Sequence, residues 1–140
     1  MTYLLDTNVV SELRRQDRAD ANVVRWAARS LSGEFYLSVI TLLELEMGVR
    51  QVQRRDPSQA AILRLWIDQD IRPRFADRLF PIDETVALRC AILHVPNPMP
   101  AHDALIAATA IVHGMTIVTR NVADFVSTGV KLINPWLADP

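Results

Sequence analysis

Hydrophobic residues along the 140-residue chain gather into two kinds of segment. Four or five short, continuous apolar runs are typical of strands that are buried on both faces of a sheet. We expect these strands at residues 3–5, 35–39, 79–82, 115–119 and 130–133. The longer segments between them repeat apolar residues at helical spacing. Strands that alternate with helices indicate a parallel sheet with helices on both faces.

Capping and turn residues mark the ends of six predicted helices. The first is capped by Thr7 or Asn8 and runs to about Arg15, and Asp56 followed by a proline starts the fourth. The other helices are expected at residues 20–31, 41–54, 84–94 and 101–113, and the fourth covers 57–71. The predicted fold is a three-layer α/β/α sandwich around a mostly parallel sheet of four to five strands. At this length we expect a single domain over residues 1–140.

Acidic residues follow several of the predicted strands. Asp6 directly follows the first strand, and Glu44 lies in the first turn of the helix after the second. Asp103 begins the last helix, while Asn121 and Asp124 follow the fourth strand. Because the carboxyl ends of parallel strands meet at one edge of a sheet, we expect these side chains to lie close together.

Clustered carboxylates repel one another unless a cation lies between them. Oxygen ligands with few histidines favour a hard ion, Mg²⁺ or Mn²⁺, which activates water and neutralises charge at a phosphodiester. Each acid also has a structural alternative. Glu44 lies three residues after Thr41, as in a capping box, Asp6 and Asp124 suit helix caps, and Asp103 complements a helix dipole. Their joint placement at one sheet edge is what favours a metal site.

Five segments make the chain resemble a known family. In order, they are LLDTNVVSE at 4–12, SVITLLELEMG at 38–48, HDALIAATA at 102–110, TRN at 119–121 and NPW at 134–136. Together they resemble the PIN-domain ribonucleases of the VapC/FitB toxin family, from residue 3 to about residue 137. The resemblance implies a PIN domain that acts as a metal-dependent endoribonuclease, the toxin of a type II toxin–antitoxin pair. It also implies a homodimer that binds a cognate antitoxin, hydrolyses RNA with Mg²⁺- or Mn²⁺-activated water, and meets DNA only through the antitoxin.

The resemblance assigns roles to the acids. The family's three best-marked acids map onto Asp6, Glu44 and Asp103, whereas its fourth commonly occupies the position of Asn121. Asp124 is close enough to supply the missing charge, or Asn121 binds the metal through its amide oxygen or a water. The expected catalytic residues are Asp6, Glu44, Asp103 and Asp124. The expected metal ligands are Asp6, Asp103, Glu44 and Asn121. The expected supporting residues are Thr7, Asn8 and Thr119.

The third and fourth predicted helices carry more apolar residues than one contact with a sheet requires. Leu43 and Met47 on the third, and Leu65 and Trp66 on the fourth, are the extra residues that we single out. They belong either to the core of a small domain or to a groove for a partner helix. The resemblance, in which the antitoxin binds over these helices, favours the groove.

Composition excludes several classes of protein. A formal net charge of −1 and a pI near 6.3 give no overall basic field for nucleic acid, so a polyanionic substrate has to be held locally. The single Cys90 excludes an internal disulfide and a cysteine zinc site. Without a basic leader or an apolar run of membrane-spanning length, we expect a cytoplasmic protein that does not contact the membrane.

Two rival functions remain, one suggested by the residues and one by the resemblance. An aspartate-nucleophile phosphohydrolase also has an acid after its first strand, but it needs a second Asp two residues later and a suitably placed lysine. Here that position is Asn8, and the only lysine is Lys131, which disfavours this class. The other rival is a catalytically weak PIN-like module that holds a DNA-binding antitoxin in a repressor complex. Asn121 supports it, and a metal-dependent cleavage assay separates the two functions.

Overall fold

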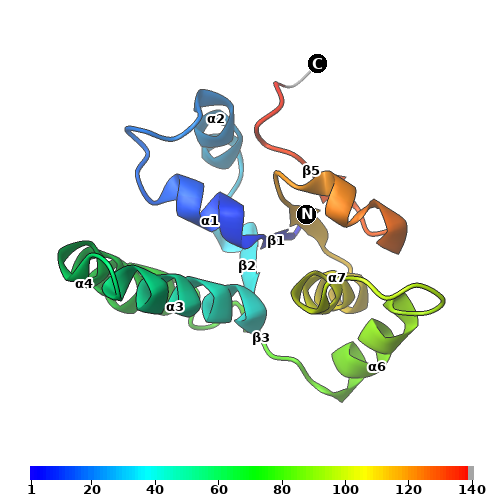
Figure 1. Ribbon diagram of the computed structural model, residues 1–140. Coiled ribbons are helices and arrows are strands. Elements are labelled where there is room, and N and C mark those ends of the chain that lie inside the picture. The colour runs from blue at the N-terminus through cyan, green and yellow to red at the C-terminus, as the bar shows by residue number, and fades with distance from the viewer. Residues whose placement is uncertain (139–140) are drawn as a thin grey trace.

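Five parallel strands form one sheet in the computed structural model, which describes residues 1–138 (Figure 1). The order across the sheet is β3 Leu79–Phe80, β2 Phe35–Ser38, β1 Tyr3–Leu5, β4 Thr116–Val118 and β5 Leu132–Ile133. Leu4 in the central strand lies opposite Tyr36 on one side and Ile117 on the other. Because every pairing is parallel, all the carboxyl ends meet at one edge, as predicted.

Both faces of the sheet are covered, which explains why its strands have continuous apolar sequences. Leu5 packs with Val10 in one core, while its neighbour Leu4 packs with Ile106 in another. The first face carries α1 Thr7–Leu13, α2 Ala21–Arg29, α3 Val39–Gln53 and α4 Pro57–Trp66, and the second carries α6 Glu84–Leu93 and α7 Ala101–His113 (Figure 1). The predicted three-layer α/β/α arrangement is confirmed.

Two helices begin earlier than predicted. The N-cap of α1 is Asp6, rather than Thr7 or Asn8, and the helix ends at Leu13 instead of Arg15. The N-cap of α3 is Ser38, whose hydroxyl accepts a hydrogen bond from the backbone N–H of Ile40 at 3.0 Å. Asp6 directly follows β1 and Ser38 is the last residue of β2, so each strand passes directly into a helix.

The expected helix at 57–71 ends early as an α-helix. After α4 comes a π-helix, Ile67–Ile71, in which the N–H of Arg72 bonds to the carbonyl of Ile67, five residues back. A short helix, α5 Arg72–Arg74, follows. Pro73 is the physical reason for the change. It lacks a backbone N–H and its ring clashes with the preceding turn of a regular α-helix, so the helix widens before it.

The remaining elements agree with the prediction to within a few residues. Asp20 and Asp83 cap α2 and α6, and α7 ends at Gly114, which adopts the left-handed conformation at φ 66°. Four strands are shorter than predicted because caps and loops take their terminal residues. Three 3₁₀ turns complete the described chain: η1 Ser32–Glu34, η3 Val122–Asp124 and η4 Val126–Thr128. No helix within residues 1–138 combines the length and apolar character needed to cross a membrane.

Candidate active site

Asp6 lies at the carboxyl end of the central strand and is only 7% exposed. Its Oδ1 accepts a hydrogen bond from the backbone N–H of Thr7 at 2.8 Å. Its Oδ2 accepts one from the Thr119 hydroxyl at 2.8 Å and one from Asn8 Nδ2 at 3.3 Å. Burial raises the pKa of Asp6, and the hydrogen bonds from Thr119 and Thr7 oppose that rise. The carboxylate is therefore held in one orientation in a poorly hydrated place.

Glu44 projects toward the same edge from the second turn of α3. Its Oε1 accepts a hydrogen bond from the Thr7 hydroxyl at 2.7 Å, and its Oε2 lies 3.6 Å from His102 Nδ1 at the start of α7. The capping-box interpretation of Glu44 is wrong, because the helix begins at Val39 with Ser38 as its cap. Thr41 is instead an interior residue of the first turn, buried and without a hydrogen-bond partner for its hydroxyl among the described residues.

Asp103 lies in the first turn of α7. Burial is the main cause that raises its pKa, and the negative charges of Asp6, Asp124 and Glu44 raise it further. His102 acts in the opposite direction. The charges of Glu44 and Asp124 also raise the pKa of Asp6. The structure thus brings the acids close enough for Glu44 and Asp124 to disfavour the ionisation of both Asp6 and Asp103.

Asn121 and Asp124, the two candidates for the fourth acidic position, make different contributions. Asn121 and Asp124 are both exposed, in the loop and 3₁₀ turn after β4. Asp124 contributes negative charge that reaches Asp6 and Asp103, whereas the backbone N–H of Asn121 donates to the Thr119 hydroxyl at 3.0 Å. The negative charge at this position therefore comes from Asp124.

Thr7, Asn8 and Thr119 link Asp6 and Glu44 into one hydrogen-bond network. The Thr119 hydroxyl, fully buried, donates to Asp6 and lies 3.3 Å from Asn8 Nδ2, which donates to it. Asn8 Oδ1 also accepts a hydrogen bond from the backbone N–H of Arg120 at 3.2 Å. The sequence identified these residues by their position beside the acids, but it did not indicate the bond between Thr7 and Glu44, 37 residues apart.

The possible metal ligands at this edge are carboxylate, hydroxyl and amide oxygens, which by their chemistry fit a hard divalent cation. A cation also removes the repulsion that raises the pKa values of Asp6 and Asp103. Within residues 1–138, however, no three His, Cys, Asp or Glu side chains converge closely enough to hold a metal ion. An ion bound here has to draw the acids inward.

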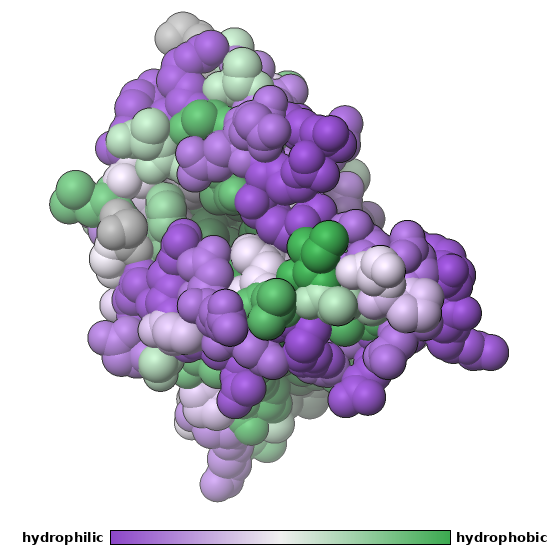
Figure 2. Space-filling model, turned by 90° about the vertical axis from the view of Figure 1, so that its left-hand side faces the viewer, coloured by the Kyte–Doolittle hydropathy of each residue, from purple (hydrophilic) through white to green (hydrophobic). Residues whose placement is uncertain are grey.

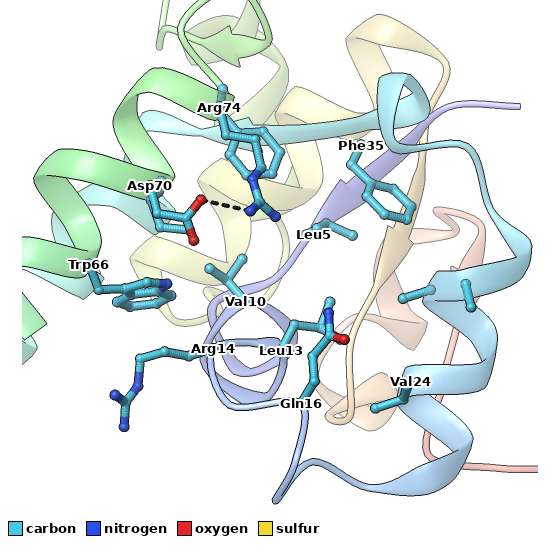
Figure 3. Close-up of a pocket in the computed structure, with 14 residues that line it drawn as sticks. Leu5, Val10, Leu13, Arg14, Gln16, Val24, Phe35, Trp66, Asp70 and Arg74 are labelled. Atoms are coloured by element: carbon cyan, nitrogen blue, oxygen red, sulfur yellow. Dashed lines mark ion pairs between the residues drawn. The ribbon is translucent and has the colours of Figure 1, made fainter.

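A separate cavity of about 320 Å³ lies among the helices on the first face of the sheet, between α1, α2 and the segment from Trp66 to Phe75 (Figure 3). Leu5, Val10 and Phe35 form apolar walls, and Trp66 lies on the side of the cavity away from Phe35. Arg14 stacks over Trp66, with its guanidinium carbon 5.9 Å from the ring centre. Other charged lining residues are Asp70 and Arg74, which form an ion pair at 2.7 Å. On the corresponding side of the molecule, Figure 2 shows a hollow with hydrophobic residues inside it and hydrophilic residues around it.

The four residues predicted to contact a partner do not share one environment. Leu43 and Met47 are each 43% exposed and Leu65 is 55% exposed, so none of these belongs to the core. Trp66 is half-buried, packs against the first core and lines the cavity. The core alternative is thus excluded for three of the four.

Comparisons with known proteins agree with this geometry. The PIN domain model matches residues 3–129. Toxin FitB of Neisseria gonorrhoeae is 36% identical and spans 95% of this chain and 97% of its own length. VapC ribonuclease Y4jK of Sinorhizobium fredii is 31% identical, with 95% and 96% covered. The crystal structure of FitAcB from Neisseria gonorrhoeae aligns with a TM-score of 0.87 and 36% identity, over 96% of this chain and 99% of that one. The chain therefore belongs to the PIN-domain family, in its VapC/FitB group of toxins.

Proposed function

We propose that this protein is an endoribonuclease that uses Mg²⁺ or Mn²⁺, and the toxin of a type II toxin–antitoxin pair. The observation that carries the proposal is the meeting of Asp6, Glu44, Asp103 and Asp124 at one edge of the sheet, where two of the four have raised pKa values. Relatives named as VapC ribonucleases support cleavage of RNA. A polyanion approaches such an edge only if a cation offsets its charge.

When bound, the divalent ion supplies a water of lowered pKa and neutralises charge on the scissile phosphate. The chain's own residues hold and orient the groups around it. Three donors hold the Asp6 carboxylate, so little ordering remains to be done when a ligand arrives. Thr7 orients Glu44 in the same way. Asp103 and Asp124 add negative charge from two further segments of the chain.

The test is cleavage of RNA by the purified protein with Mn²⁺ or Mg²⁺ and in EDTA. We expect cleavage only with metal, and we expect Asp6→Asn to abolish it at nearly constant side-chain volume. Asp17→Asn, at an exposed turn after α1, is the matched control and should cleave as wild type does. Cleavage in EDTA, or full activity of Asp6→Asn, would overturn the proposal.

A second candidate function has a specific observation in its favour. Asn121 replaces the expected fourth acid, and no three of the potential ligands within residues 1–138 already converge. A catalytically weak module that acts mainly within a DNA-binding toxin–antitoxin complex is compatible with both. The solved structure of FitAB bound to an IR36 DNA fragment, 35% identical with a TM-score of 0.89 over 99% of both chains, supports this class of assembly. Absence of metal-dependent cleavage in the assay above would favour it.

Both candidate functions include antitoxin binding. We place the binding surface on helices α1 to α4, which cover the first face of the sheet. The cavity beside Trp66 offers a site for an apolar anchor, and Leu43, Met47 and Leu65 add exposed apolar surface on the same helices. With a net charge of −1, the chain is expected to meet DNA only through the antitoxin. A homodimer is expected as well, and analytical ultracentrifugation measures it.

Trp66→Ala tests this surface. We expect the variant to weaken binding to the co-expressed antitoxin by about 2 kcal/mol or more, as for an aromatic anchor. Leu88→Ala, an exposed apolar residue of α6 on the other side of the sheet, is the control and should bind normally. If calorimetry finds unchanged affinity for a folded Trp66→Ala protein, the antitoxin binds elsewhere.

A further inference from the structure

Arg120 lies closer to the acidic edge than the sequence alone indicates. It follows Thr119, the residue whose hydroxyl donates to Asp6. One amide side chain joins the two positions, because Asn8 accepts from the backbone N–H of Arg120 at 3.2 Å and donates to Asp6 at 3.3 Å. The backbone of Arg120 is therefore fixed by the same network that fixes Asp6.

The Arg120 side chain is exposed and lies over an aromatic ring. Its guanidinium carbon is 5.3 Å from the ring centre of Trp136. Among residues 1–138, no carboxylate forms an ion pair with it. A cation–π contact orients the group without neutralising its charge, so the guanidinium remains able to bind an anion.

Trp136 is a firm support for that cation. Its backbone N–H donates to Asn134 Oδ1 at 3.0 Å, and its carbonyl accepts from Asn22 Nδ2 at 2.9 Å. The ring packs against the first core. Asn134 also donates to the carbonyl of Arg120 at 3.5 Å, which ties the end of β4 to the segment after β5. Figure 1 shows this C-terminal segment beside α2, where Asn22 lies.

We propose that Arg120 binds a phosphate of the RNA strand that flanks the cleavage site, with Trp136 as the residue that positions it. The inference rests on the proposed cleavage of RNA. The acidic edge repels a polyanion and the chain as a whole is close to neutral, so substrate binding needs local positive charge. The planar guanidinium matches two oxygens of a phosphate. The Arg120 backbone is fixed beside Asp6 through Asn8, which places the side chain next to the acidic edge, where a flanking phosphate would lie.

Arg120→Gln is the main test, measured as kcat and KM for a single-stranded RNA with Mn²⁺ at several NaCl concentrations. We expect KM to rise on the order of tenfold, with kcat within about twofold of wild type. Loss of one phosphate contact should also reduce the slope of log kcat/KM against log salt by about 0.7. Arg89→Gln, an exposed arginine of α6, is the matched control and should change neither value.

Trp136 is tested by a pair of substitutions. Trp136→Leu removes the aromatic ring and should raise KM without lowering kcat, while Trp136→Phe keeps a ring and should largely restore KM. An Arg120→Gln variant with wild-type KM and salt slope would overturn the inference while the proposed function stands, and so would a loss confined to kcat. A wild-type protein that cleaves no RNA under these conditions would overturn both.

Discussion

At the scale of single residues, Asp6 and Asp103 show how the fold sets the chemistry of its acids. Both carboxyls have pKa values above their ordinary range, chiefly because burial disfavours the charged form. The rise in the pKa of Asp6 is partly offset by the hydrogen bonds that Thr119 and Thr7 donate to its carboxylate. The pKa of Asp103 is raised further by the negative charges of Asp6, Asp124 and Glu44, so its ionised form is disfavoured at neutral pH.

The sign of this cost gives a prediction for Asp103→Asn. A carboxyl whose folded-state pKa is raised contributes stability below its unfolded value, about 4, and loses it as pH rises through the folded value. In EDTA, the variant should therefore melt above wild type at pH 7, by about 2–4 °C for each kcal/mol of repulsion removed. The difference should shrink as pH falls toward 4.

Calorimetric melting of both proteins between pH 4 and pH 7 measures this. Asp17→Asn serves again as a control, since it removes one negative charge at an exposed turn. An Asp103→Asn protein that melts below wild type at pH 7 in EDTA would show that the acids do not repel one another as the structure indicates.

At the scale of elements, the residue at which α3 begins decides whether Glu44 belongs to a capping box or bonds to another segment. Ser38 satisfies an N–H at the helix end, while the Thr41 hydroxyl has no partner within the described residues. The sequence offered Thr41 as the cap because its spacing to Glu44 is that of a capping box. The strand instead passes directly into the helix at Ser38, which leaves Glu44 free to bond with Thr7 from another segment.

Two substitutions separate these roles by their effect on the free energy of unfolding. Ser38→Ala should destabilise the protein by about 1 kcal/mol, within the range of lost N-caps. Thr41→Val removes a buried hydroxyl that lacks a partner at nearly the same volume, so it should be neutral or stabilising. Urea unfolding in EDTA measures both, and a larger loss for Thr41→Val would show that Thr41 is the cap after all.

At the scale of the whole molecule, the parallel sheet explains why acids from distant segments meet. Every strand delivers its carboxyl end to one edge, so residues after β1 and β4 and at the starts of α3 and α7 become neighbours. The repulsion among them is a property of the assembled domain, because the unfolded chain separates these charges.

A divalent cation should therefore stabilise the protein against heat. At 100 times its dissociation constant a ligand contributes about 2.7 kcal/mol. For a domain of this size we expect a rise of about 5–10 °C in Tm with Mn²⁺. NaCl at the same ionic strength should give much less, and Asp103→Asn should lose most of the Mn²⁺ effect. Equal shifts from Mn²⁺ and NaCl in calorimetry would argue against a metal site at this edge.

Much of this protein follows from the sequence by itself. Apolar runs and capping residues are local signals, and they located all five strands and most helix ends to within a few residues. The acids at the ends of strands followed from the same pattern, as did the resemblance to PIN-domain proteins. These features are readable because a residue's backbone preference depends on the few residues around it.

Only the tertiary structure decided how distant segments meet. Thr119 donates to Asp6 across 113 positions, Arg120 stacks on Trp136, and Trp66 lines a cavity rather than entering the core completely. Such contacts depend on strand register and on how helices pack against the sheet, and no local spacing encodes them. The sequence could therefore name the acids and their order along the chain, while packing determined which neighbours hold Asp6 and Glu44 and which ring supports the Arg120 guanidinium.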